Sequence, residues 1–473
     1  MRPLSWRLGT RPSKTRIPFR YGQACLTECP QALLEIKLEI DGRVVNGYAS
    51  DCLPPLWFDK SGKRTFAEQI DDMLNAITAS ASVFNSARSI QSLGVAVRLL
   101  WGSTEGSERP PLLDSFGHSM VERCIIDASC RHRGQSFREL LSSGDLYQGY
   151  STDLAAWGTK ATVSPWQRDM SSGSISVRHT VGLGDPLTRG DIAGGKVLDD
   201  GLPETLEDHL LLNGIRYLKV KVGNRGAEDV DRLKEIHRVV SATGLQDVRY
   251  TLDGNEQYSS IAEFIDFWRE LLRHRELKSL ANSVLAVEQP LNRSRAFDEV
   301  ATQGLLEFGK QMPVIIDESD ARKSDCWKAI CLGYSGTSSK ACKGVTKALV
   351  NRQLIEDEQR RQPRRRFVMT GEDLCCVGVV GLQSDLALVS AMGLKHVERN
   401  GHHYHSGLRY LDETCYEEIL SCHGDLYQGV QGVPALKIQS GEISLESVNR
   451  DGFGFTVDPH FETYQVVREG GAG

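Results

Sequence analysis

A regular alternation of short β-rich runs and helical runs begins near Ser174 and constrains the fold of this 473-residue chain more than any other feature. Helical patterns such as 227–242 and 261–273 fill the intervals, and each strand–helix unit takes roughly 30 residues, the repeat of a parallel (β/α) barrel. The sequence therefore predicts an α/β fold with a barrel of TIM type. Its strands are expected at 175–183, 215–222, 248–252, 283–287, 314–316, 333–339, 367–370 and 396–397.

The first third has a different, α+β texture. Strands at 32–38 and 43–49 flank the turn Asp41-Gly42, and helices are expected at 66–84 and 119–141. The signal is weak over 142–173, and short strands return at 434–455. We predict a capping domain over residues 1–165, a barrel over 174–410 and a C-terminal segment over 411–473 that returns to the capping domain.

Bulk composition excludes several function classes. The net charge of −6 gives no general attraction to nucleic acid or anionic membrane. No apolar run reaches the ~20 residues of a membrane span, and no apolar stretch follows the basic residues 1–16 as in a secretory signal. The twelve scattered cysteines predict a reduced, cytoplasmic protein, although a zinc or disulfide role for Cys25 and Cys29 stays open.

Lysines and acids stand at the ends of successive strands. The second strand ends in Lys219-Val220-Lys221, and a period of two places both lysines on one side. The next three strands end at Asp253, Glu288 and Asp317, at the rim that carries the active site in such barrels. Three converging carboxylates suit Mg²⁺, with Mn²⁺ as the alternative ion.

The sixth strand ends at Lys340, roughly across the barrel mouth from the second. Lysines on two sides of a metal could take the α-proton of a carboxylate substrate, through an ene-diolate that the cations stabilise. Other interpretations stay open: solvated lysines on an edge strand, acids that cap helices, or Lys343 in place of Lys340.

The series KVK, DGN, VEQP, IIDES and SSKACK resembles the enolase superfamily, and within it the muconate lactonizing enzyme-like branch, which includes dipeptide epimerases. This resemblance implies a modified (β/α)7β barrel with an α+β cap. It also implies Asp253, Glu288 and Asp317 as metal ligands, Asn255 and Glu318 as their neighbours, and Lys221 and Lys340 as bases on opposite faces, with Lys219 beside Lys221. Glu372 stands where the mandelate racemase-like branch has a histidine, which argues against that branch.

Contacts to the substrate are less defined. Arg178 and His179 end the first strand, where substrate binding and structural hydrogen bonding are equally open. Glu372 and His402 are further candidates, and His402, His403 and His405 could instead bind a metal or be polar loop residues. Specificity is expected from residues 19–23 and 50–57 of the cap.

The favoured function is racemisation or epimerisation of a small carboxylate such as an amino-acid derivative or dipeptide. A cycloisomerase or dehydratase of the same superfamily, or a barrel that only binds ligands, is the alternative. We expect a homo-oligomer without nucleic-acid or membrane partners.

Overall fold

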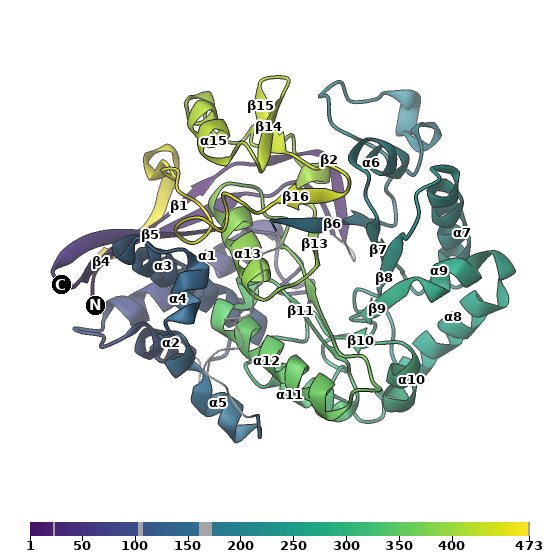
Figure 1. Cartoon of the computed structure of the whole chain (residues 1–473), viewed down its shortest axis with the longest axis horizontal. Coiled ribbons are helices and arrows are strands. Elements are labelled where there is room, and N and C mark those ends of the chain that lie inside the picture. Colours follow the sequence, from purple (N-terminus) through teal and green to yellow (C-terminus); the bar gives the residue numbers. More distant parts are fainter. Residues whose placement is uncertain (22–23, 103–106, 160–172, 472–473) are drawn as a thin grey trace.

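A barrel of parallel strands ringed by helices forms one side of the molecule, and a curved antiparallel sheet with its own helices forms the other (Figure 1). The computed structural model describes residues 1–21, 24–102, 107–159 and 173–471. Among these residues, none of the helices combines the length and apolar character that crossing a membrane would require.

Parallel pairing joins the barrel strands in the order β10-β9-β8-β7-β6-β13-β12-β11. The ring closes between its two end strands, because Ile316 N donates to Gly336 O at 3.1 Å and Ser338 N donates to Ile316 O at 2.9 Å. The strands are β6 (Ser174–Val181), β7 (Tyr217–Lys221), β8 (Arg249–Asp253), β9 (Val284–Glu288), β10 (Val314–Ile315), β11 (Gly336–Ser339), β12 (Val368–Gly371) and β13 (His396–Arg399).

Helices follow the barrel strands in turn and cover the outside of the ring. Amphipathic α8, for example, buries Ile261, Phe264, Trp268 and Leu271 on one stripe, and Ser260 caps its first turn. These helices are α6 (Leu206–Asn213), α7 (Ala227–Ala242), α8 (Ile261–Arg273), α9 (Lys278–Asn282), α10 (Leu305–Gln311), α11 (Asp325–Leu332), α12 (Val345–Arg361), α13 (Val380–Ala391) and α14 (Gly401–Tyr404).

The cap sheet has the strand order β17-β1-β4-β5, all antiparallel. The β4–β5 turn uses Asp41 and Gly42, both at positive φ, as the sequence predicts. The cap elements are β1 (Arg2–Arg11), β2 (Lys14–Tyr21), β3 (Ala24–Glu28), β4 (Gln31–Ile40), β5 (Arg43–Cys52), α1 (Phe66–Asn85), α2 (Leu93–Gly102), α3 (Pro111–Arg133), α4 (Phe137–Ser142) and α5 (Ser151–Ala156).

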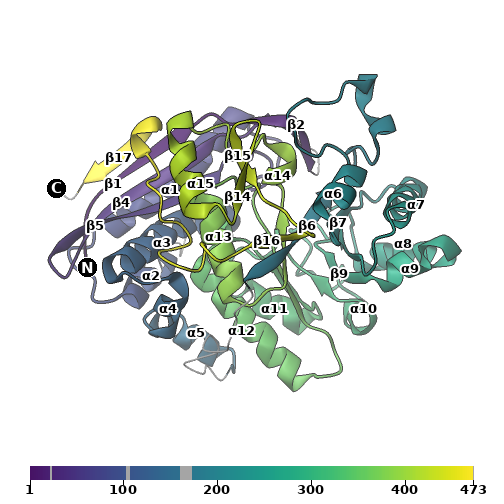
Figure 2. The same ribbon diagram turned by 45° about the horizontal axis from the view of Figure 1, so that its top comes forward.

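The C-terminal segment contacts both parts of the molecule. Its last strand β17 (Gln465–Gly471) pairs with β1, beside which it lies in both views (Figures 1 and 2). The earlier β16 (Glu442–Ser444) pairs with β6 of the barrel instead. The other elements are α15 (Tyr416–His423), β14 (Tyr427–Val430) and β15 (Val433–Leu436).

Helix α3 connects the cap to the barrel. Its Glu122 carboxylate accepts hydrogen bonds from Val345 N at 2.7 Å and Thr346 N at 3.0 Å, at the start of α12. A carboxylate there satisfies free amides and complements the helix dipole. The cap is thereby attached to the segment that follows β11, the strand that leads to Lys340.

The predicted fold class is confirmed: an α/β barrel with an α+β cap that includes the C-terminal tail. Two details of our predictions differ. The helix expected over 119–141 is divided, because Gly134 ends α3 at φ 59° and Ser136 begins a capping box for α4. The strands at 434–455 do not join the cap sheet; residues 465–471 do. Part of the expected connection, 160–172, lies outside the described residues.

Candidate functional site

Two lysines of β7 point into the barrel at the carboxyl end of the strand. Lys219 and Lys221 are two residues apart, so their side chains share a face, and both line one pocket. Lys219 is buried and its Nζ donates to Glu288 Oε1 at 2.8 Å and Glu398 Oε2 at 3.1 Å, and also to Glu372. Its ammonium group is therefore held among carboxylates.

Asp253 at the end of β8 is engaged by both lysines. Its Oδ2 accepts from Lys221 Nζ at 2.5 Å and lies 3.1 Å from Lys219 Nζ. Its Oδ1 accepts from the backbone amide of Asn255 at 2.8 Å, and Asn255 Nδ2 donates to Glu318 Oε1 at 3.2 Å. Asn255 thus lines the pocket, contacts the predicted ligand Asp253 and connects it to Glu318.

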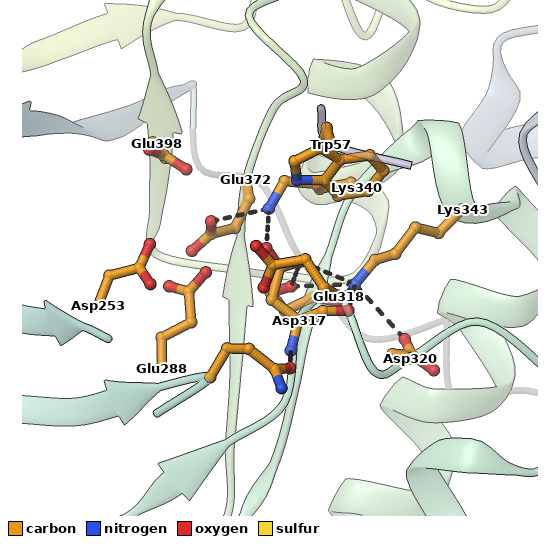
Figure 3. Close-up of polar contacts among 12 residues, drawn as sticks. Trp57, Asp253, Glu288, Asp317, Glu318, Asp320, Lys340, Lys343, Glu372 and Glu398 are labelled. Atoms are coloured by element: carbon orange, nitrogen blue, oxygen red, sulfur yellow. Dashed lines mark hydrogen bonds and ion pairs between the residues drawn. The ribbon is translucent and has the colours of Figure 1, made fainter. Parts of the chain in front are cut away.

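Just after β10, two strands from β8 around the ring, Asp317 is held between two lysines. Lys340 Nζ donates to Asp317 Oδ2 at 2.7 Å, whereas Lys343 Nζ donates to Asp317 Oδ1 at 3.1 Å. Lys340 also donates to Glu372 Oε2 at 3.2 Å, and the Trp57 ring lies 5.7 Å from its Nζ (Figure 3). Among the described residues that line the pocket, Lys340 is present and Lys343 is not.

Glu372, predicted as a substrate contact, lies at the centre of the carboxylate group (Figure 3). The Arg178 guanidinium donates to Glu372, to Gly371 O at 3.1 Å and to His396 Nδ1 at 2.6 Å. Arg178 is fully buried by these contacts, so the geometry assigns it to positioning Glu372 rather than to the pocket.

His179 and His402 lie away from the barrel interior. His179 is the β6 residue between Arg178 and Thr180, whose side chains contact Glu372 and Glu398 inside the barrel, so His179 points outward. Its Nδ1 is 3.2 Å from His402 Nε2. Neither histidine belongs to the described residues that line the pocket, so the geometry does not support their predicted contact with substrate.

Burial and mutual repulsion disfavour the ionised form of some carboxylates in this site. Burial opposes the charged form of Lys219, yet the carboxylates around it raise its pKa well above the ordinary value. Burial and the neighbouring Glu372 raise the pKa of Glu288 well above its ordinary value, and burial raises the pKa of Glu398 to about 7. Extra positive charge would let these acids ionise.

A divalent cation fits this group of acids. Oxygens of Glu288, Asp317 and Glu372 lie within 4.8 Å of one another. The buried Glu288 Oε2 has no hydrogen-bond partner among the described residues. All the donors are oxygens, which Mg²⁺ prefers. The geometry thus brings Glu288 and Asp317 together with Glu372 and leaves Asp253 to the lysines.

The cap closes one side of the pocket. Phe19, Pro54 and Trp57 line it together with the barrel residues Thr180, Leu374, Cys375 and Asn400. The cap segments expected to set specificity, 19–23 and 50–57, thus both reach the pocket, although 22–23 lie outside the described residues.

Two features of the site were missed by the sequence reasoning. Glu398 of β13 accepts from Lys219 and from Asn400 Nδ2 at 3.3 Å. Its signal is the run Glu398-Arg399-Asn400 at the end of the eighth strand, which stands at the same rim as the other acids. Lys60 of the cap reaches Glu318 Oε1 at 3.3 Å, a contact between distant segments that no local pattern indicates.

No protein-family model matches the chain, and no curated protein matches its sequence. Solved structures do match over nearly the whole chain. The N-succinyl Arg/Lys racemase of Bacillus cereus is 13% identical, covers 99% of each chain and has a TM-score of 0.62. A muconate lactonizing enzyme of Pseudomonas fluorescens is 15% identical over 98% of this chain and 99% of its own, with a TM-score of 0.62.

A third match is a dipeptide epimerase of Cytophaga hutchinsonii, solved with Mg and the dipeptide D-Ala-L-Val. It is 14% identical over 99% of each chain, with a TM-score of 0.57. The chain therefore has the fold of the enolase superfamily, in the form found in muconate lactonizing enzymes, which confirms the predicted resemblance at the level of fold.

Proposed function

We propose that the protein is an Mg²⁺-dependent enzyme that removes and returns the α-proton of a small carboxylate, most simply as a racemase or epimerase. The observation that carries this proposal is that Lys221 and Lys340 line the same pocket from opposite sides of the barrel. Their strands, β7 and the β11 end, are four positions apart in either direction around the closed ring. A substrate between them would have one lysine on each face of its α-carbon.

The lysines differ in how they are held. In this arrangement, the carboxylates of Asp317 and Glu372 outweigh burial and raise the pKa of Lys340 well above its ordinary value. Lys340 is therefore protonated and can supply a proton on its face of the substrate, while Lys221 on the other face is the candidate base for one substrate configuration. The reverse reaction exchanges these roles, as an isomerase requires.

Lys219 has a different role from its neighbour. It lines the pocket, but its ammonium group donates to Glu288, Glu372 and Glu398, which uses all three of its N–H groups. We assign it to holding these carboxylates in place and to supplying fixed positive charge near the substrate carboxylate.

Glu288 and Asp317 would hold the Mg²⁺ ion, with Glu372 or the sequence-predicted Asp253 as the third ligand. The bound ion would supply charge that stabilises the dianion formed when the α-proton leaves. Asn255 and Glu318 would orient the ligand side chains from behind.

The matched structures support the choice of substrate class. They include a racemase of N-succinyl amino acids and an epimerase that holds Mg and a dipeptide. The matched lactonizing enzyme favours a cycloisomerase as the second candidate. A cycloisomerase that moves a proton on one face of its substrate would need only one of the two lysines. A cytoplasmic homo-oligomer stays a prediction.

Proton exchange in D₂O tests the proposal. A panel of dipeptides and N-succinyl amino acids, in both configurations, is incubated with the protein and MgCl₂, and the α-hydrogen signal is followed by NMR. We expect Mg²⁺-dependent exchange of both configurations. Lys221→Gln should lower exchange of one configuration at least about 100-fold, and Lys340→Gln that of the other.

Lys310→Gln is the matched control, because this lysine is exposed on α10 and, among the described residues, pairs only with Glu307. It should exchange as the unmodified protein does. Loss of both configurations with one lysine variant and of neither with the other would favour the cycloisomerase. No exchange anywhere in the panel would contradict an isomerase of this class and favour a barrel that only binds ligands.

A further inference from the structure

Four histidines meet on the outer side of β6, outside the proposed active site. His179 comes from β6, His209 from α6, and His402 and His403 from α14. His179, His209 and His403 are buried, and His402 is half-buried. We call this group the histidine cluster. Its rings pack closely in tilted and edge-to-face arrangements, with centroids 4.1 Å apart for His179 and His209 and 5.1 Å apart for His209 and His402.

Ring nitrogens in the cluster face one another. His179 Nδ1 lies 3.2 Å from His402 Nε2, and His209 Nε2 lies 2.9 Å from His403 Nδ1. Each contact needs one N–H and one lone pair, so the four rings must hold complementary tautomers. His403 Nε2 has no hydrogen-bond partner among the described residues, and the nearest carboxylate oxygen, Asp185 Oδ2, is 3.9 Å away.

Within the described part of the chain, no carboxylate hydrogen-bonds to any of the four rings. Burial lowers the pKa of His179 and His209 well below the ordinary value and that of His402 to about 3, so the rings are neutral at pH 7. The neutral imidazole, whose lone-pair nitrogen can exchange a hydrogen bond for a metal ion, is the form that binds metal ions.

The spacing also suits a metal ion. One nitrogen each from His179, His209 and His402 can be chosen so that all three lie within 4.8 Å of one another. Zinc–nitrogen bonds of ~2.0–2.1 Å place tetrahedral ligands about 3.3 Å apart. The 3.2 Å separation of His179 Nδ1 and His402 Nε2 already meets this value, and small side-chain shifts would bring in His209.

We propose that His179, His209 and His402 form a second metal site, selective for Zn²⁺ or a similar imidazole-preferring dication rather than Mg²⁺. Three nitrogen ligands favour such ions, whereas Mg²⁺ prefers oxygen. His402 is half-buried, which leaves an entry path and room for a water or a fourth ligand. With Asn213 at His209 Nδ1, His209 would bind the ion through Nε2, in place of its contact with His403 Nδ1.

The surroundings provide the contacts that orient metal-binding histidines. Asn213 Nδ2 donates to His209 Nδ1 at 3.2 Å, and its amide can turn to accept from the other tautomer. An ion there would connect β6 to α6 and α14. The ion would bind His179 and so stabilise β6, the strand that separates the two sites. The next residue, Thr180, donates to Glu398 in the barrel.

Metal content and cobalt spectra test this site without any reliance on activity. The purified protein is equilibrated with ZnCl₂ or CoCl₂ in excess MgCl₂, which occupies the oxygen site, and bound metal is counted after dialysis. We expect one tightly bound Zn²⁺ per chain, visible Co²⁺ absorption typical of tetrahedral nitrogen ligands, and a higher unfolding temperature with Zn²⁺.

His402→Asn and His209→Asn should abolish the tight Zn²⁺, the Co²⁺ absorption and the thermal shift. His405→Asn is the matched control: this buried histidine follows the same segment but contacts Ser13 and Cys375 instead. It should retain all three signals. If a variant fails to fold, Zn-edge anomalous diffraction from the unmodified protein decides, with a peak expected between the three rings.

Absence of bound Zn²⁺ in the unmodified protein, or a signal that is lost with Asp317→Asn and kept with His402→Asn, would overturn this proposal. Neither result bears on the proposed isomerase, which is tested by proton exchange in Mg²⁺ alone.

Discussion

Two buried clusters of ionisable side chains lie on the two faces of β6, and they offset the cost of burial in different ways. Inside the barrel, Arg178 and Thr180 face carboxylates that are matched by ammonium and guanidinium groups. Outside, the intervening His179 faces neutral imidazoles. Buried charge is tolerated only when it is paired, and buried imidazole avoids charge by losing its proton. One strand thus separates a site suited to a hard cation from a site suited to a softer one.

The largest difference between the clusters should appear when a central group is removed. Lys219→Met leaves Asp253, Glu288, Glu372 and Glu398 without their shared ammonium group. We expect a loss of about 3–5 kcal/mol in unfolding free energy, because the substitution leaves buried carboxylates without a compensating positive charge. Urea denaturation at pH 7.5 measures it. A loss below that of His179→Asn would show that the inner pairing is not what stabilises the barrel.

The next largest effect should be the stabilisation of the fold by Mg²⁺, which we expect to depend on the inner cluster and not on the outer one. An ion that binds only the folded protein stabilises it by about 2.7 kcal/mol at 100 times its dissociation constant. Asp317→Asn should remove this stabilisation, because it takes away an oxygen ligand of the inner cluster. His402→Asn, on the outer face, should keep it. The shift in unfolding temperature caused by MgCl₂ measures this stabilisation. Equal shifts in both variants would contradict the claim that Mg²⁺ binds only the inner cluster.

Thr180 allows a subtler test on the inner face. Its hydroxyl donates to Glu398, and Thr180→Val removes this hydrogen bond with little change in shape. Asn400 Nδ2 still donates to the same Glu398 oxygen at 3.3 Å, so we expect a loss of about 0.5–1.5 kcal/mol, the net contribution of one hydrogen bond. Denaturation of this variant beside Val181→Ala, a purely apolar change on the same strand, separates lost hydrogen bonding from lost packing. An unchanged midpoint for Thr180→Val would mean that the hydroxyl does not hold Glu398.

The smallest expected effect concerns the pH dependence of the unfolding free energy, to which the two clusters contribute with opposite sign. Glu398 has a folded pKa raised to about 7, so the folded state holds its proton longer and stability from this group falls as pH rises from about 4.5 to 7. His402 has a folded pKa lowered to about 3, so its contribution rises with pH between about 3 and 6.5.

Unfolding free energy measured from pH 4.5 to 7 should therefore change slope in opposite directions in two variants. Glu398→Gln should make stability rise more steeply with pH, and His402→Asn should make it rise less steeply. Slopes that shift in the same direction would contradict the assignment of the two faces.

Much of the inner cluster could be predicted from the sequence. Parallel strands end at one rim, so Asp253, Glu288 and Asp317 had to converge, and a period of two fixed the shared face of Lys219 and Lys221. What the sequence could not decide is which acids share an ion. That depends on which lysine reaches which oxygen, and Lys221 and Lys219 both reach Asp253.

The outer cluster was missed for a simple reason. Adjacent residues of a strand point to opposite faces, so Arg178 and His179 could not both face the pocket, although both were candidates for contact with the substrate. The contact of His179 with His209 depends on the packing of α6 against β6, which local patterns do not specify. Strand β1 was also missed, because its residues are paired only by distant β4 and β17.

Anomalous diffraction from crystals grown with Mn²⁺ would locate the ion relative to the two lysines. We expect a peak inside the barrel, bounded by oxygens of Glu288 and Asp317, with the amines of Lys221 and Lys340 on opposite sides of it. An empty barrel, or a peak with both amines on one side, would contradict this arrangement.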